Sequence, residues 1–428
     1  MKVTLLSYGT RGDVQPFVAL ASALQDQGVD VLLAAPDNHR DFVTRAGIPY
    51  APLTGDIQAI LESEQGRQWL SKGNVVAFVK AMTDMGHALR HGLMRDIHAA
   101  CTGSDAIISQ VVIQDLAMIS AEKLQIPLMF VHLFPLCGTS AFPSPLVTIA
   151  DLPLPLLNRW THDLFNFVWW QASRRVINEL RRNLGVRRIS ETANVRSRAL
   201  KTPTLQVFSP YVLRRPRDWG AEHVVTGFWQ LPDAVKARLG ELEPPPALVA
   251  WLAAGPPPIY VGMGSMPVQD PAVMMQLVSD VATEQGVRAV IGAGWPVPDD
   301  LPQDLTSHVF VVNGVNHDWL FPKCTAIVHH GGAGTTAASL RAGAPTLICA
   351  VFADQPFWGK RLVSLGVGTW MPYAKLNHDT LLAGLRHLED RNLKKRAAAL
   401  GIAMRQEDGL ANAVKAIAVR LATAPIPR

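Results

Sequence analysis

The chain has 428 residues, of which 48% are hydrophobic and 18% charged, so it is not a disordered protein and it exceeds the roughly 250–300 residues of a single core. Its 40 basic and 35 acidic residues leave a net charge of only +5, and arginine pairs concentrate positive charge between residues 170 and 220. Without a recognition-helix pattern or a basic-and-aromatic module, these pairs favour a solvated basic face or an anionic membrane surface over nucleic acid.

The N-terminal apolar run ends at Gly9, too soon for the core of a signal peptide, and no stretch approaches the ~18 apolar residues of a membrane span. The four cysteines are scattered, without metal-ligand or redox spacing. We therefore expect a cytoplasmic protein with buried free thiols, and peripheral membrane contact stays open.

The first half of the chain alternates short apolar runs with helical patterns, as a parallel sheet with crossover helices does. The expected strands are 3–7, 29–35, 106–110 and 128–132. Residues 16–27 are expected to form a helix, with Pro16 near its first turn and Gly28 ending it.

Proline-rich runs at 244–246 and 256–258 mark a segment with little periodicity. We expect a first domain over 1–215, a linker over 216–245 and a second domain over 246–428, whose last helix is free to pack on the first. Further strands are expected at 259–263, 288–291, 309–312, 326–329 and 346–350. The fold class is α/β, with two facing Rossmann-like, doubly wound domains and a ligand in the cleft between them; a generic pair of Rossmann domains has the same pattern.

The most informative segment is 326–359. An apolar run ends in His329 and His330, and three glycines, two threonines and an alanine-rich helical sequence follow. A strand that turns through glycines into a helix directs backbone N–H groups and the positive end of the helix dipole at one point, which predicts a phosphate site. Beyond that helix, Asp354 and Gln355 offer groups that bind sugar hydroxyls. Glycine-rich turns also serve packing alone, but the two features together indicate recognition of a nucleotide sugar.

A second glycine-containing turn follows the first strand, at residues 7–16. Asp13 lies just before the expected helix, where an aspartate ordinarily caps the first turn and stabilises it by about 1 kcal/mol. A carboxylate that points into the cleft instead acts as a general base, because a hydroxyl acceptor is a poor nucleophile until it loses its proton.

The sequence from Cys324 to Thr336 resembles the donor-binding signature of glycosyltransferase family 1, the GT-B enzymes that use nucleotide sugars, and looks most like the branch of sterol glucosyltransferases and bacterial antibiotic glycosyltransferases. The opening Gly-Thr-Arg-Gly-Asp-Val-Gln-Pro is similar to the first motif of that branch, in which the aspartate matching Asp13 is the proposed catalytic base. The plant secondary-metabolite branch typically has a histidine base there. The resemblance covers most of the chain but is weak between residues 145 and 210.

The resemblance also implies the donor-binding residues. Backbone amides at Gly334, Thr335 and Thr336, together with the His329 side chain, are expected to stabilise the diphosphate. Asp354 and Gln355 are expected to bind the sugar. The other expected donor contacts are Gly12, Gly264, Ser265, Trp295, Asn313, Val315, Gly331, Gly332 and Ala333.

The acceptor is expected in the first domain, where proline-interrupted apolar loops precede an aromatic run. The expected contacts are His132, Phe134, Phe142 and Trp170, and packing of a helix pair is the alternative for these aromatic residues. No metal and no other cofactor is expected, since no Asp-x-Asp motif is present and the adjacent residues His329 and His330 of a strand point to opposite faces.

The motifs therefore predict an inverting glycosyltransferase that moves a hexose, above all glucose from UDP-glucose, to a hydroxyl of an apolar acceptor such as a sterol or a polyketide. One alternative is a dTDP-deoxysugar donor. The others are a non-catalytic or regulatory protein that binds nucleotide sugars, and hydrolysis or epimerisation of the nucleotide sugar.

Overall fold

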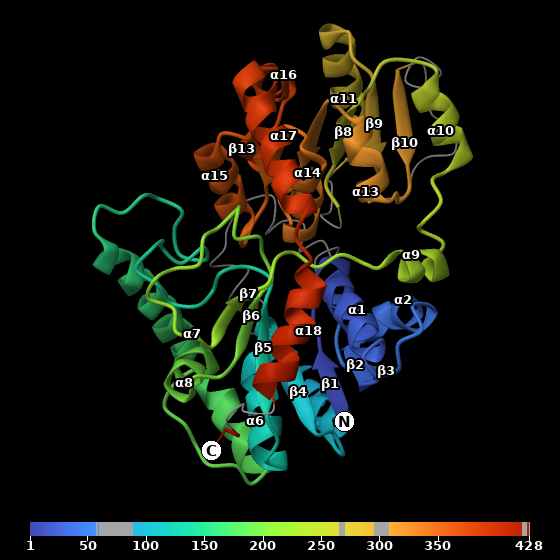
Figure 1. The fold of residues 1–428 in the computed structure, drawn as a ribbon. Helices are drawn as coiled ribbons and strands as arrows, with labels where there is room; N and C mark the ends of the chain where they lie inside the picture. The colour runs from blue at the N-terminus through green and yellow to red at the C-terminus, as the bar shows by residue number, and fades with distance from the viewer. Residues whose placement is uncertain (57–58, 60–88, 265–269, 295–307, 422–425, 428) are drawn as a thin grey trace. The chain divides into compact units, whose positions relative to one another are not determined.

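The structure is a computed structural model that describes residues 1–56, 59, 89–264, 270–294, 308–421 and 426–427. The chain packs into two compact units (Figure 1). The first is formed by Met1–Ile57, Val76–Leu239 and Asp408–Arg428, and the second chiefly by Gly240–Glu407. Each unit is built on its own parallel sheet with helices packed against it, which confirms the expected pair of Rossmann-like α/β domains.

The first unit contains a seven-stranded sheet in the order β3-β2-β1-β4-β5-β6-β7. Its strands are β1 (Lys2–Leu6), β2 (Asp30–Pro36), β3 (Tyr50–Leu53), β4 (Ala106–Gln110), β5 (Leu128–His132), β6 (Thr204–Gln206) and β7 (His223–Val225). The order reverses between β1 and β4, so the carboxyl ends of these two strands flank the topological switch point. Because Leu6 pairs with Ser109, Gln110 lies beside the turn that follows β1.

Successive residues of these strands face two different cores, as the pleat requires. Leu5 and Ile108 join the core that contains α1 (Arg11–Gln25) and α18 (Gly409–Arg420). Leu6 and Ile107 join the core beneath α6 (Gln114–Leu124), α7 (Pro155–Asn183) and α8 (Ala193–Leu200). The helix α18 is thus part of the first unit, where Asn412 also donates a hydrogen bond to the Thr226 carbonyl at 3.0 Å.

A buried ion cluster ties α6, α7 and α8 together. The Glu122 side chain is 3% exposed and receives Arg181 of α7 on one oxygen and Arg196 of α8 on the other. The Arg181 side chain is 1% exposed, so these charges are removed from solvent and depend on one another. The cluster fixes the direction in which the long helix α7 leaves the core.

The second unit contains a six-stranded sheet in the order β10-β9-β8-β11-β12-β13, which reverses between β8 and β11. Its strands are β8 (Ile259–Gly262), β9 (Ala289–Gly292), β10 (Val309–Val312), β11 (Ala326–His329), β12 (Thr346–Ala350) and β13 (Gly368–Pro372). Its helices are α10 (Pro246–Ala253), α11 (Pro271–Gln285), α13 (His317–Leu320), α14 (Ala333–Ala342), α15 (Gln355–Leu365), α16 (His378–Leu388) and α17 (Arg391–Arg405).

The predicted start of the first helix is wrong. The helix α1 begins at Arg11, because the side chains of Thr10 and Asp13 form a capping box that satisfies its first turn. Asp13 is therefore the third residue of the helix and not the residue before it, and Pro16 lies inside the helix. The range 216–245, predicted as a linker, contains β7 and α9 (Asp233–Leu239) of the first unit. None of the described helices is long and apolar enough to cross a membrane.

Candidate active site

Asp13 lies just after the turn that follows β1, and its two carboxylate oxygens have separate partners. Oδ2 accepts hydrogen bonds from the Thr10 backbone N–H at 2.8 Å and from the Thr10 hydroxyl at 3.2 Å. Oδ1 accepts the side-chain amide of Gln110 at 2.7 Å. Gly9 permits this approach, because its φ is +145° and a Cβ atom there would lie 2.2 Å from Asp13 Oδ2. Gly12, a predicted donor contact, is exposed in the same helical turn.

The surroundings of Asp13 act on its pKa in opposite directions. Burial raises the pKa of the Asp13 carboxyl above its ordinary value, and it outweighs the bonds from Thr10 and Gln110 and the nearby His39, which lower it. No described group fills the second acceptor position on Oδ1. The half-buried carboxylate is therefore able to take a proton from a hydroxyl group.

His329 ends β11 with a buried imidazole whose bonds define its protonation state. Its Nδ1 accepts the Gly331 backbone N–H at 2.9 Å, so the proton of the neutral ring is on Nε2. Burial, followed by the charges of His330 and His317, holds the pKa of His329 well below its ordinary value. Among the described residues the Nε2–H group has no hydrogen-bond partner, and an orphaned buried donor calls for a ligand or a water.

The helix α14 begins directly after this turn, with Gly332 as its N-cap. The Thr336 N–H bonds to the Gly332 carbonyl at 2.9 Å, so the prediction of a free amide at Thr336 is wrong. The amides of Ala333, Gly334 and Thr335 precede that bond and have no partner within the helix. Thr336 offers its hydroxyl instead, which is buried and unpaired within the described part of the chain.

The glycines around His330 are set by close approach. Gly264, which follows β8, has a φ of +59°, and a Cβ atom there would lie 2.7 Å from His330 Cε1. A Cβ atom on Gly332 would lie 2.4 Å from His330 Nε2. Burial lowers the pKa of His330 to about 4, so this ring is also neutral. Because β8 and β11 are neighbouring parallel strands, Gly264 and the glycine turn after His329 lie together at the carboxyl ends of the strands. Ser265 lies outside the described residues.

Asp354 and Gln355 stand where β12 leads into α15. The Gln355 Oε1 atom accepts the backbone N–H groups of Val351 at 2.7 Å and Phe352 at 3.2 Å, which orients the side-chain amide. The Asp354 Oδ2 atom accepts the indole Nε1–H of Trp358 at 2.6 Å. Trp358 is fully buried, so this hydrogen bond orients the Asp354 carboxylate by means of a side chain that is itself fixed in the core.

Ala353, immediately before this pair, has a φ of +57°. A left-handed backbone in a residue other than glycine costs on the order of 1–3 kcal/mol, and such strain concentrates at functional sites. Neither Ala353 nor Trp358 was predicted from the sequence as part of the site. Trp358 follows Asp354 by four residues, a spacing that brings two side chains together on a helix. This spacing was the signal in the sequence for their contact.

The loop after β10 carries the residues predicted to hold the nucleoside. Asn313 is exposed, and Val315 packs on the core that contains Leu320 and Phe321. Asn316 caps α13 by accepting the Asp318 N–H at 3.0 Å, which fixes the end of this loop. Trp295 lies outside the described residues.

The predicted acceptor residues lie in different surroundings. His132 ends β5, is buried, and contacts the Cys137 thiol through Nδ1 at 3.4 Å. Phe142 packs edge-on against Trp219, with ring centroids 6.5 Å apart. Phe134 is partly exposed, and Trp170 packs on the core beneath α6 and α7. Trp170 thus has the packing contacts of the helix-pair alternative.

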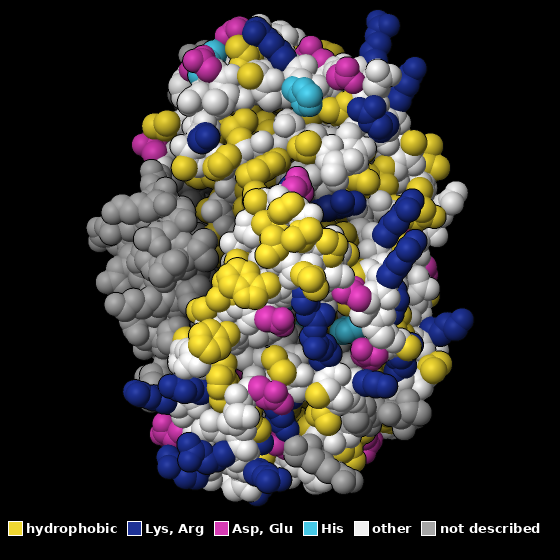
Figure 2. Space-filling view, turned by 90° about the vertical axis from the view of Figure 1, so that its left-hand side faces the viewer, with side chains coloured by type: hydrophobic (Ala, Val, Ile, Leu, Met, Phe, Trp, Pro, Cys, Tyr) yellow, Lys and Arg dark blue, Asp and Glu magenta, His cyan; other side chains and the backbone are white. Residues whose placement is uncertain are grey.

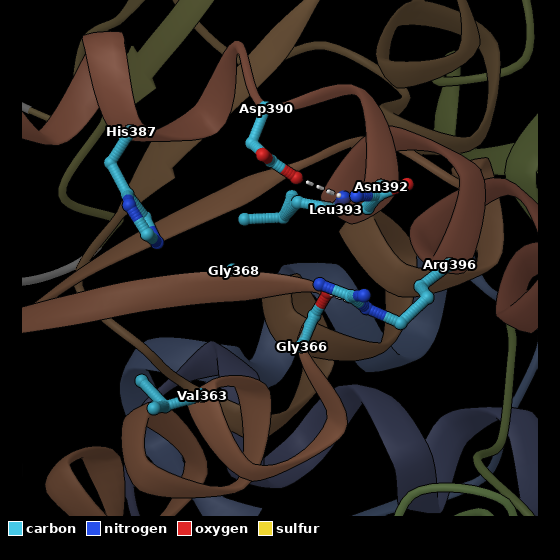
Figure 3. A pocket seen from close by; sticks show the side chains of 8 residues that line it. All are labelled: Val363, Gly366, Gly368, His387, Asp390, Asn392, Leu393 and Arg396. Carbon is cyan, nitrogen blue, oxygen red and sulfur yellow. Dashed lines mark hydrogen bonds between the residues drawn. The ribbon is translucent and has the colours of Figure 1, made fainter.

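A pocket of about 420 Å³ lies near the amino end of β13 in the second unit, where α15 ends and β13 begins (Figure 3). Arg396 donates to the Gly366 carbonyl at 2.8 Å, and Asp390 accepts the Leu393 N–H at 2.7 Å. These bonds cap and join local helices. The pocket contains none of the predicted site residues, and we assign it no ligand.

Two family models match the ends of the chain. Residues 3–143 match the glycosyltransferase family 28 N-terminal domain, and residues 298–417 match the erythromycin biosynthesis protein CIII-like C-terminal domain. A sterol 3-beta-glucosyltransferase of Arabidopsis thaliana is 35% identical over 447 residues, which cover 100% of this chain and 68% of the relative. An uncharacterized glycosyltransferase of Mycobacterium tuberculosis is 34% identical over 393 residues, or 90% of each protein.

Solved structures share the fold. The glycosyltransferase of kitacinnamycin superimposes with a TM-score of 0.71 at 18% identity, over 98% of this chain and 99% of that chain. The calicheamicin glycosyltransferase superimposes with a TM-score of 0.67 at 14% identity, over 99% of each chain. The family models, the sequence relatives and the shared fold agree with one another. The chain therefore belongs to the nucleotide-sugar-dependent glycosyltransferases of GT-B fold, in the branch of the sterol glucosyltransferases and bacterial antibiotic glycosyltransferases, and is a hexosyltransferase.

Proposed function

We propose that the enzyme transfers glucose from UDP-glucose to a hydroxyl group of a large apolar acceptor, with inversion at the anomeric carbon and without a metal ion. The observation that carries the proposal is the buried Nε2–H of His329, which has no partner among the described residues and ends the strand that leads into the N-terminus of α14. Neutral donors gathered at a helix N-terminus suit a diphosphate whose negative charge grows as it leaves. The Arabidopsis relatives, whose names are sterol 3-beta-glucosyltransferases, supply the choice of glucose and of an apolar acceptor.

In the proposed reaction, the acceptor hydroxyl donates to Asp13 Oδ1. Its proton moves to that oxygen as the acceptor oxygen bonds to the anomeric carbon. The bond between the anomeric carbon and the diphosphate breaks on the opposite side, so one displacement inverts the configuration. The His329 Nε2–H group, the α14 amides and the Thr336 hydroxyl then stabilise the UDP that leaves.

The surface of α7 supports an apolar acceptor that is met at a membrane. Leu156, Trp160 and Phe167 recur on the outer side of its first half and are 79%, 59% and 60% exposed. Exposed arginines follow at the end of this helix and beyond it, namely Arg174, Arg175, Arg182, Arg187 and Arg188. In Figure 2, which faces the side of α7, hydrophobic side chains form a band, and Lys and Arg side chains lie below it and to its right. Such a surface suits the interface of an anionic bilayer.

A deoxysugar on dTDP is the alternative donor. It is motivated by the solved structure of the glycosyltransferase VinC in complex with dTDP, which is 18% identical to this chain and superimposes with a TM-score of 0.63. A protein that binds nucleotide sugars without turnover is the alternative of another class.

One experiment separates these possibilities. The purified protein is incubated with UDP-glucose, UDP-galactose or dTDP-glucose and with acceptors that run from free glucose to a sterol, and the products are identified by mass spectrometry. We expect a glucosylated sterol or polyketide from UDP-glucose. Product from dTDP-glucose alone would select the alternative donor, and nucleotide binding without product would reject the enzyme. Turnover of small hydrophilic acceptors only would reject the apolar acceptor.

A further inference from the structure

Gln110 is the last residue of β4, and its side chain is almost wholly buried at 1% exposure. Gln110 belongs to no motif that is recognisable in the sequence. Because β4 is the neighbour of β1 at the point where the strand order reverses, the end of β4 meets the turn that carries Asp13. The contact joins residues 97 positions apart in the chain.

Two hydrogen bonds fix the orientation of the Gln110 amide. The Tyr8 backbone N–H, which can only donate, lies 2.7 Å from Gln110 Oε1. The nitrogen must therefore face the other way, and Gln110 Nε2 lies 2.7 Å from Asp13 Oδ1. A rigid backbone donor thus directs a side-chain donor at one oxygen of the carboxylate.

We propose that Gln110 is a positioning residue for the base, which selects Asp13 Oδ1 as the oxygen that receives the acceptor proton. This inference rests on the proposed function. Oδ2 already accepts two bonds from Thr10, so it is occupied. Oδ1 accepts only Gln110 among the described residues and keeps one acceptor position. The amide therefore holds the carboxylate plane while leaving that position to the substrate hydroxyl.

The bond also favours the ionised form of the base. Burial raises the pKa of Asp13, and the donor at Gln110 opposes that rise. The other groups that face the carboxylate are Thr10 of its own helix and His39, whose ring Nε2 lies 3.1 Å from the Gly9 carbonyl. Without the amide, the pKa of Asp13 rises further, and the base is lost at a higher pH as the solution is acidified.

The test compares pH profiles of kcat/KM for Gln110→Leu, Gln110→Glu and the wild type. We expect the acidic limb of Gln110→Leu to move upward by about 1–2 pH units, since a hydrogen bond to a charged group is lost. Gln110→Glu keeps the shape of the side chain, but its negative charge repels the Asp13 carboxylate. The acidic limb of its pH profile is therefore expected to move upward at least as far as that of Gln110→Leu. Gln114→Leu, which removes another buried glutamine of the same unit, is the matched control and leaves the limb in place. UDP affinity is unchanged in all variants.

A uniform loss at every pH, without a shifted limb, would show that Gln110 only supports the fold and would overturn the inference. The pKa of Asp13 is also read directly, by NMR of carboxyl-labelled aspartate, with the signal assigned from its absence in Asp13→Asn. An unchanged pKa in both Gln110 variants overturns the inference whether or not sugar transfer is seen. A wild type that transfers no sugar to any acceptor instead rejects the proposed function.

Discussion

The Asp13 carboxylate caps the first turn of α1 with one oxygen and leaves an acceptor position on the other. The sequence presents a cap and a base as alternatives at this position. In the structure, Oδ2 closes the capping box with Thr10, while Oδ1 keeps an acceptor position. The two roles are divided between the two oxygens, so the capping contact does not exclude the proposed base.

Asp13→Asn tests that base. An amide keeps the size of the side chain but cannot remove a proton, so turnover is expected to fall by about 10²–10⁴. Steady-state kinetics measures the loss, and calorimetry with UDP is expected to show unchanged nucleotide affinity. Turnover close to that of the wild type would leave Asp13 with its capping role alone.

His329→Ala removes the orphaned Nε2–H donor. We expect weaker UDP binding and slower transfer, because a buried donor to a phosphate oxygen is lost. The pKa of His329 lies well below 6.5, so the ring stays neutral and its contribution to UDP affinity stays constant between pH 8 and pH 6. Calorimetry at both pH values measures this, with His387→Ala, an exposed histidine of the same unit, as the control. Equal affinity in His329→Ala and wild type would contradict the assignment.

Trp358→Phe removes the indole donor to Asp354, together with part of the volume of a buried side chain. The carboxylate then loses its fixed orientation, so KM for the nucleotide sugar is expected to rise by about tenfold while affinity for free UDP is kept. Trp251→Phe, in α10, controls for the loss of an indole elsewhere in the unit. A parallel loss of affinity for free UDP would show that Trp358 supports the whole turn and not the sugar contact.

At the scale of elements, the sequence predicted apolar strands better than strands that are very short or contain proline. The strands 106–110, 128–132, 309–312, 326–329 and 346–350 have the predicted bounds, because each consists mostly of apolar residues. The strands β3, β6, β7 and β13 were missed. Two of them contain a proline and the other two have only three residues, so pairing with a neighbour, and not an apolar run, defines them.

The candidate site shows the same limit. The turn at 329–336 and the pair at Asp354 were recognisable, since each is a local motif. Gln110 was not, because its importance arises from the pairing of β1 with β4 and nothing near it in the chain marks it. The orphaned His329 Nε2–H is equally invisible in sequence, since the tautomer depends on the Gly331 amide.

The cluster of Glu122, Arg181 and Arg196 gives an energetic prediction for α7. Glu122→Gln removes the negative charge that both buried arginines contact, so the free energy of unfolding is expected to fall by roughly 3–5 kcal/mol. The triple variant Glu122→Leu, Arg181→Met, Arg196→Met removes all the charges together and is expected to regain most of that loss. Urea unfolding measures both. A triple variant less stable than Glu122→Gln would show that the ion cluster itself stabilises the helices.

For the whole molecule, the basic and apolar surface of α7 predicts binding to anionic vesicles. Co-sedimentation with phosphatidylserine vesicles is expected, and it weakens as salt is raised because the arginines are exposed. The double variant Trp160→Ser, Phe167→Ser is expected to bind at least tenfold more weakly. Ile402→Ser with Val419→Ser, which removes exposed apolar groups elsewhere, serves as the control. Equal sedimentation of both double variants would reject α7 as the contact.

The place of α18 has a consequence for how the protein is made. Its residues Ala413 and Ile417 complete the core that also buries Phe17 and Leu20 of α1. A ribosome makes α1 early, but it supplies α18 only after the whole of Gly240–Glu407, a delay on the order of ten seconds. During that time the apolar side of α1 lacks its contacts with α18, while the residues Gly240–Glu407 of the second unit are already available to fold. The first unit is therefore completed after the second, and the apolar side of α1 stays uncovered in the nascent chain until α18 emerges.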